Sequence, residues 1–100
     1  MKYFMVIGSF TEGVQRDAAF REVLKRHHAF TKKLMDEGKI LFAGPRPAGG
    51  GVLVMKGESL EEVEGWFEED PFKTENINTY EFIEFICFDG QDFVMDWFKK

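Results

Sequence analysis

Hydrophobic and polar positions repeat with two different periods along the chain, and the changes between them predict its elements. Apolar residues two apart, rich in β-branched and aromatic types, predict strands at residues 2–7, 40–43, 52–55 and 79–88. Apolar residues three and four apart predict helices at residues 17–37, 59–70 and 92–98. The first six elements therefore follow the order β-α-β-β-α-β, and a short tail helix comes last.

The ends of the two long helices carry recognisable signals. Asp17 can cap the first amides of one helix, and Ser59 with Glu62 forms a capping box at the start of the other. Gly38 suits the left-handed turn after the first helix. Pro71 pushes Asp70 out of the helical region, so the second helix is expected to end there.

This order of elements is the split βαβ, or ferredoxin-like, arrangement of an α+β protein. Both helices then pack on one face of a four-stranded antiparallel sheet. Strands 2–7 and 79–88 are apolar on both faces, so the other face of the sheet is expected to be bare and apolar. A homodimer with the two sheets packed face to face would bury it. We expect one domain over residues 1–100, with a core at 1–88 and a helical tail at 89–100.

Composition narrows the possible partners. The 100 residues include 12 phenylalanines, 13 basic and 18 acidic residues, giving a net charge of −5 that argues against nucleic acid as a partner. The apolar runs are too short to span a membrane. Cys87 is the single cysteine, so no disulfide can form within the chain. With no signal-peptide pattern at the N-terminus, a cytoplasmic location is expected.

One polar side chain falls inside the apolar stripe of the first helix. At about 100° per residue, His27 lies near the centre of the stripe formed by Phe20, Val23, Phe30 and Leu34. Either a hydrogen bond satisfies a core histidine there, or the stripe lines a pocket. His28 lies one step round, towards the edge. The two adjacent histidines diverge, and no third ligand has suitable spacing, so we expect no metal site and no cofactor.

Two motifs carry a resemblance to a known family. Gly38 follows His27 by eleven residues and opens the run Gly-Lys-Ile-Leu-Phe-Ala-Gly-Pro, and Asp70-Pro71-Phe72 ends the second helix. Together they resemble the signature of the YCII-related family over roughly residues 1–88. The resemblance implies a dimeric α+β barrel of ferredoxin-like fold. It also implies an active site in which His27 and Asp70 face a common pocket.

The resemblance leaves the reaction open. Most members of the family have no established reaction, and one branch is similar to a dehydrochlorinase in which a His/Asp pair promotes loss of chloride from a chlorinated trihydroxybenzene. An imidazole held by a carboxylate can act as a general base near neutral pH. We therefore expect a cofactor-free lyase or isomerase acting on a small aromatic or carbonyl metabolite. The alternative is a non-catalytic dimeric module with a small-molecule-binding or regulatory role.

Three further residues are assigned to substrate binding: Arg46, Phe30 and Pro71. Arg46 lies beside a run of three glycines, where it either contacts an anionic substrate or faces solvent. Asp-Pro is also a common dipeptide at helix ends, which is the structural alternative for Asp70. Asn76 takes the place of the glycine that the family carries after Asp-Pro, and it can adopt the same left-handed turn.

Overall fold

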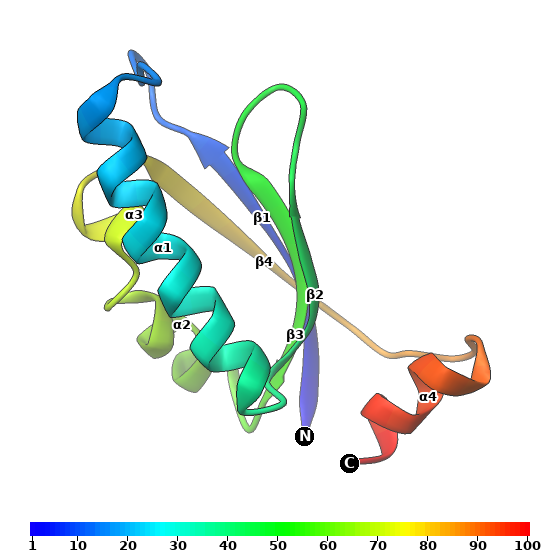
Figure 1. The fold of residues 1–100 in the computed structure, drawn as a ribbon. Coiled ribbons are helices and arrows are strands. Elements are labelled where there is room, and N and C mark those ends of the chain that lie inside the picture. The colour runs from blue at the N-terminus through cyan, green and yellow to red at the C-terminus, as the bar shows by residue number, and fades with distance from the viewer.

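The computed structural model describes all residues, 1–100, and Figure 1 shows its elements. Their order confirms the predicted β-α-β-β-α-β pattern with a tail helix. The elements are β1 (Lys2–Phe10), α1 (Ala18–Asp36), β2 (Ile40–Pro45), β3 (Gly51–Gly57), α2 (Leu60–Phe67), α3 (Pro71–Thr74), β4 (Asn78–Phe85) and α4 (Asp92–Lys99).

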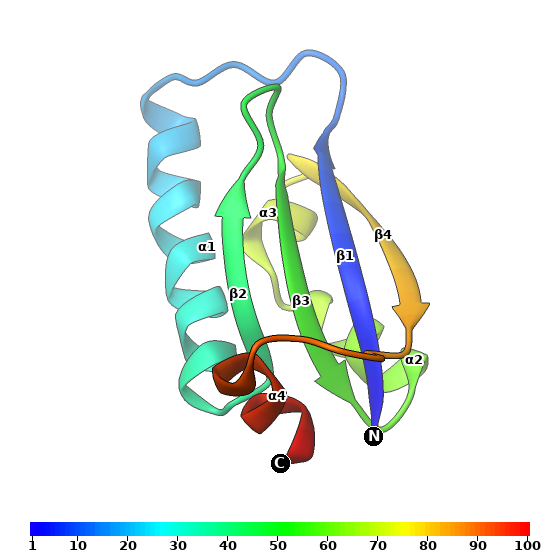
Figure 2. The ribbon, with the colours of Figure 1, turned by 90° about the vertical axis from the view of Figure 1, so that its right-hand side faces the viewer.

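The four strands form one antiparallel sheet in the order β2-β3-β1-β4. Helices α1, α2 and α3 cover one face of the sheet, whereas α4 lies against the opposite face near the N-terminus of β1 (Figures 1 and 2). This is the ferredoxin-like arrangement of an α+β protein that the sequence predicts. None of the helices is both long and apolar enough to cross a membrane.

Local signals mark both ends of α1 and the start of α2 as expected, whereas α2 ends at Phe67, before the expected end at Asp70. The Asp17 side chain accepts from the Phe20 amide, and Ser59 accepts from the Glu62 amide. Gly38 has φ +77°, the left-handed conformation that follows a helix end. The Asp17 cap and the Gly38 turn therefore set the two ends of α1, and with them the position of His27 along the sheet.

Strand alternation divides the apolar residues between the two faces. Phe4 and Val6 of β1 pair with Met55 and Leu53 of β3, and all four are buried beneath the helices. The intervening residues of β1, such as Met5, point to the opposite face. A second apolar group lies nearer the start of α1 and includes Phe20, Val23, Phe72 and Ile77.

Residues 71–74 and the end of the last strand differ from the sequence-based expectations, whereas the turn at Asn76 agrees with them. Residues 71–74, expected to be irregular, form the single turn of α3, because Asp70 caps it and Pro71 occupies its first position. Strand β4 ends at Phe85, so 86–88 run beyond the sheet, with Ile86 and Phe88 exposed. Asn76 has φ 57°, which confirms the left-handed turn.

The prediction of a bare second sheet face is wrong in part. Helix α4 covers one end of that face and is held by three hydrogen bonds (Figure 2). Tyr3 Oη donates to Phe98 O at 2.8 Å, Trp97 Nε1 donates to Gly38 O at 2.9 Å, and Lys56 Nζ donates to Trp97 O at 2.7 Å. The rest of the face stays open.

Candidate functional site

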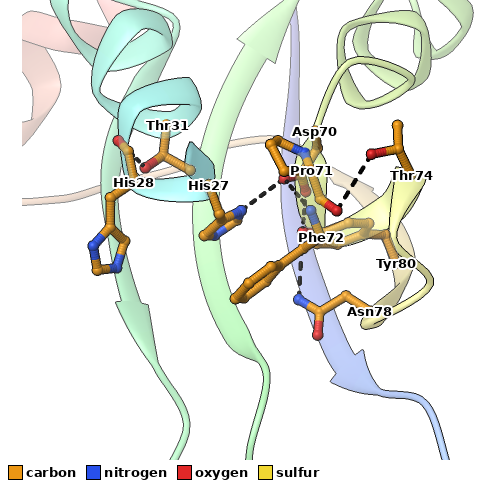
Figure 3. A network of polar contacts seen from close by, with 9 residues as sticks. All are labelled: His27, His28, Thr31, Asp70, Pro71, Phe72, Thr74, Asn78 and Tyr80. Carbon is orange, nitrogen blue, oxygen red and sulfur yellow. Dashed lines mark hydrogen bonds and ion pairs between the residues drawn. The ribbon is translucent and has the colours of Figure 1, made fainter. Parts of the chain in front are cut away.

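His27 points from α1 towards the start of α3 (Figure 3). Its ring stacks on Phe72, with ring centroids 4.1 Å apart and an interplanar angle of 5°. The side chain is 16% exposed. His28, one residue later, points away from this contact and is exposed. Because adjacent helix positions point in different directions, His27 packs between α1 and α3 whereas His28 faces solvent.

Asp70 supplies the partner of His27. Its Oδ1 lies 2.7 Å from His27 Nδ1 and accepts from the Phe72 amide at 3.0 Å. The side chain is fully buried, at 0% exposure. The residue has extended backbone geometry and caps α3, because Pro71 occupies the first helical position after it. The helix-end interpretation of Asp-Pro and the site interpretation therefore both apply, and a single oxygen atom serves both.

Tyr80 and Asn78 of β4 complete the group. Tyr80 Oη donates to Asp70 Oδ2, and Asn78 Nδ2 donates to Tyr80 Oη at 3.3 Å. Burial, followed by the charge of Asp70, raises the pKa of the Tyr80 phenol above its usual range. Gly8 lies opposite Tyr80 on β1, and a Cβ atom there would come within 2.9 Å of the Tyr80 ring. Glycine at this position therefore leaves room for the tyrosine ring.

These four polar side chains lie where the two apolar clusters of the helix-covered layer meet. Phe72 of the second cluster packs on His27, and Phe67 of the first cluster packs on Tyr80 with ring centroids 4.7 Å apart. Such surroundings strengthen each hydrogen bond and would make an unpaired carboxylate costly. The apolar clusters hold the polar group in a fixed geometry.

The arrangement leaves one reactive atom free. With Nδ1 bonded to Asp70, His27 Nε2 makes no hydrogen bond within the chain. Asn78 Oδ1 is the only buried side-chain nitrogen or oxygen atom that lacks a hydrogen bond. His27 Nε2 also lacks a hydrogen bond, so it is not buried and reaches solvent. An imidazole with one nitrogen held by a carboxylate and the other accessible can accept a proton from a bound molecule.

The other predicted residues lie at different distances from this group. Pro71 adjoins Asp70 as the first residue of α3, and Phe30 packs one helical turn beyond His27 with its ring 5.5 Å from that of Phe67. Arg46 is not brought to the pair: its Nη1 donates to Ser9 Oγ at 3.2 Å and to Gly8 O at 3.4 Å. By strand alternation Ser9 faces the side of the sheet opposite the helices.

Tyr80 and Asn78 were not identified from the sequence. The alternation that groups Tyr80 with Phe82 on one face of β4 was visible, and a hydroxyl on a helix-covered face needs a partner.

No group of three or more His, Cys, Asp or Glu side chains is placed to hold a metal ion.

Two cavities open at the surface, neither is lined by His27, and only the first is lined by members of the polar group. One, of about 500 Å³, lies at the β4 edge and is lined on one side by Tyr80, Asn78, Phe67 and Phe82. The other, of about 340 Å³, is a shallow hollow between the loop that follows β1 and the start of α1. The first therefore reaches the Asn78 and Tyr80 end of the polar group, within the volume range typical of small-molecule sites.

Comparisons with known proteins agree with this architecture. A family model described as the YCII-related domain matches residues 1–86. A similar solved structure is that of 5-chloro-2-hydroxyhydroquinone dehydrochlorinase (TftG) from Burkholderia phenoliruptrix AC1100, in complex with 2,5-dihydroxybenzoquinone. The two chains have 21% sequence identity and a TM-score of 0.60, and the match covers 88% of this chain and 95% of that one. No curated protein matches the sequence.

Proposed function

This chain belongs to the YCII-related family, and from that premise we propose that it is a small cofactor-free enzyme in which His27 acts as a general base. The observation that carries the proposal is the 2.7 Å contact between His27 Nδ1 and the fully buried Asp70 carboxylate, which leaves Nε2 accessible. The structural neighbour, a dehydrochlorinase that binds a hydroxylated quinone, supports a small aromatic molecule as the substrate class.

The chemistry needs only one proton carrier. His27 Nε2 takes a proton from a phenolic hydroxyl or from a carbon next to a carbonyl, and Asp70 stabilises the imidazolium that forms. The freed electron pair moves into the ring. If the proton returns at another carbon, the result is isomerisation. For elimination from a chlorinated phenol, the first proton returns to the ring carbon that bears chlorine and makes it tetrahedral. His27 then removes a second hydroxyl proton, chloride leaves that carbon as a ring double bond re-forms, and the proton passes from His27 to water, so the net result is loss of HX.

The experiment compares His27→Gln with His28→Gln. Chloride release from 5-chloro-2-hydroxyhydroquinone measures turnover, and calorimetry with 2,5-dihydroxybenzoquinone measures binding. Loss of a general base lowers rates by about 10²–10⁴-fold, so His27→Gln is expected to lose turnover while binding changes by less than about threefold. His28→Gln is expected to match the unsubstituted protein, because its ring does not reach Asp70.

A non-catalytic binding module is the second candidate. It is favoured by the cavity at the β4 edge, whose lining includes Tyr80 but not His27. Such a module would bind the quinone without releasing chloride from the chlorinated compound, and His27→Gln would leave its affinity unchanged. Turnover that survives in His27→Gln would contradict the general-base proposal.

We also propose that two copies pack through the open part of the sheet. Met5, Phe42 and Ile83 are exposed large apolar residues, and by alternation they share the face opposite α1 and α2. Exposed apolar surface of this kind is typical of association sites. A dimer would have to accommodate α4, which covers one end of the same face. The mass of the protein in solution tests this.

A further inference from the structure

We propose that Tyr80 and Asn78 are positioning residues that orient Asp70 and thereby keep the proton of neutral His27 on Nδ1, so that Nε2 is the base. The inference deepens the proposed function, since it concerns the same histidine. It rests on the direction of each hydrogen bond in the chain Asn78–Tyr80–Asp70–His27 (Figure 3).

The direction of the chain is set at its far end. An amide nitrogen can only donate, so Tyr80 Oη accepts from Asn78 Nδ2 and keeps its single proton for Asp70 Oδ2. The opposite orientation of the Asn78 amide would present its oxygen to Tyr80 and compete with Asp70 for that proton. Asn78 therefore makes Tyr80 a donor towards the carboxylate.

The other carboxylate oxygen is constrained in the same way. The Phe72 amide can only donate, and its hydrogen bond goes to Asp70 Oδ1. Both oxygens of Asp70 thus accept, as an ionised carboxylate does, and the remaining contact at Oδ1 requires a proton on His27 Nδ1. Neutral His27 then has its lone pair on Nε2, the atom that reaches solvent.

One unpaired atom supports a positioning role for Asn78. Its side chain is buried, and Asn78 Oδ1 is the only buried side-chain polar atom without a partner. An apolar residue would avoid that penalty but would lose the hydrogen bond to Tyr80, so the amide brings little net stability. The asparagine is explained instead by its nitrogen, which donates to Tyr80 and so directs the Tyr80 proton towards Asp70.

Few charged or titratable groups face His27. Asp70 faces it from the start of α3, and Tyr80 of β4 acts on it through Asp70. His28, on the same helix, has its ring centroid 6.1 Å away. A change at Tyr80 should therefore reach His27 through the carboxylate alone, and His28 provides an internal reference.

The test is nuclear magnetic resonance of the full chain with labelled histidines. The tautomer of His27 and the pH midpoint of its titration are measured in the unsubstituted protein, in Tyr80→Phe and in Asn78→Leu. In the unsubstituted protein the neutral ring should carry its proton on Nδ1. In Tyr80→Phe, the carboxylate loses a donor and becomes a stronger partner for imidazolium, so the midpoint of His27 should rise.

Asn78→Leu gives a smaller change of the same sign and covers the case in which Tyr80→Phe does not fold. Without the amide donor, Tyr80 donates more weakly, so the midpoint should rise by less than in Tyr80→Phe. The thermal midpoint of this variant should change little, because removal of the unpaired buried acceptor offsets loss of the hydrogen bond to Tyr80. The His28 midpoint should stay constant in both variants.

Three results would overturn the positioning role: an Nε2 proton on neutral His27, an unchanged His27 midpoint in both variants, or equal shifts at His27 and His28. These results are separate from the fate of the proposed enzyme. Loss of turnover in His27→Gln with an unchanged midpoint in Tyr80→Phe would keep the general base and remove Tyr80 from its control.

Discussion

The two faces of the sheet bury polar groups in different ways. On the helix-covered face, Asp70 is fully buried and shares its two oxygens among His27, Tyr80 and the Phe72 amide. On the opposite face, Lys56 is buried under α4, where its Nζ meets Trp97 O at 2.7 Å and lies 4.4 Å from the centroid of the Trp97 ring. One arrangement is a chain of side chains, and the other is a single cation held by one residue.

The two arrangements have different roles: the chain that includes His27 is a candidate site, whereas Lys56 anchors α4. The chain on the helix-covered face ends at an accessible nitrogen that can exchange a proton with a bound molecule. The ammonium of Lys56 has no carboxylate partner, and its contacts serve to hold α4. In this protein a buried polar group therefore indicates chemistry only where its hydrogen bonds hold a second, solvent-accessible atom in place, as they hold His27 Nε2.

The largest effect on stability is expected for Asp70→Ala. The substitution leaves the Tyr80 hydroxyl and the Phe72 amide without their acceptor and also removes the cap of α3. Breaking such a buried group costs about 3–5 kcal/mol, which lowers the melting temperature of a domain this size by more than about 10 °C. Thermal unfolding monitored by circular dichroism measures it.

Asp36→Ala is the matched control, since Asp36 pairs with Lys32 at 3.1 Å on the exposed side of α1. An exposed pair of this spacing contributes about 0.3–0.5 kcal/mol, so its melting temperature should change little. A similar small change in Asp70→Ala would show that water replaces the missing carboxylate, and the two faces would then not differ as described.

An intermediate effect is expected for the open part of the sheet. Ile83 and Met35 are each 40% exposed, but Ile83 lies on the open sheet face and Met35 on α1, which covers the other face. If the open face is the interface between two copies, Ile83→Glu should raise the dissociation constant at least about tenfold, because a buried unpaired charge is costly. Met35→Glu should leave it unchanged.

Sedimentation velocity over a range of concentrations distinguishes the two variants. A monomer at all concentrations in the unsubstituted protein would mean that α4 already covers enough of the face. Equal weakening by both substitutions would instead indicate an interface on another surface.

Some features of these two regions could be predicted from the sequence and others could not. Caps such as Asp17 and Ser59 act within one helical turn, so the starts of the two long helices could be predicted. The position of His27 in the apolar stripe follows from helical spacing. Its pairing with Asp70, 43 residues away, came from the family resemblance, because spacing cannot relate distant elements.

Residues whose roles depend on register could not be predicted. Tyr80 reaches Asp70 only because β4 pairs with β1 so that Gly8 lies opposite it, and alternation gives a face but no register. Likewise, the third strand was expected to end at Met55, whereas β3 includes Lys56 and presents it to α4. The anchoring of the tail depends on a residue just beyond that expected end.

The smallest effect is expected for Lys56→Met, and its sign depends on pH. Burial, with a further contribution from Lys100, lowers the pKa of Lys56 below the ordinary value of 10.5. At neutral pH the lysine is charged in both the folded and the unfolded chain, and the folded state carries the desolvation penalty. As the pH rises through the lowered pKa towards 10.5, only the unfolded chain retains the proton, so the penalty disappears and stability from this group increases.

Lys56→Met removes that penalty and also removes the hydrogen bond to Trp97 O, so near neutral pH the two effects should offset each other within about 1 kcal/mol. Urea unfolding at pH 7 and at pH 10 measures the difference, with Trp66→Phe in both proteins so that Trp97 is the only tryptophan. The unsubstituted protein should gain stability relative to the variant between these pH values, since only its lysine titrates. A constant difference would mean that water reaches the ammonium, and that the aromatic contacts of Trp97 and Phe98 hold α4 without it.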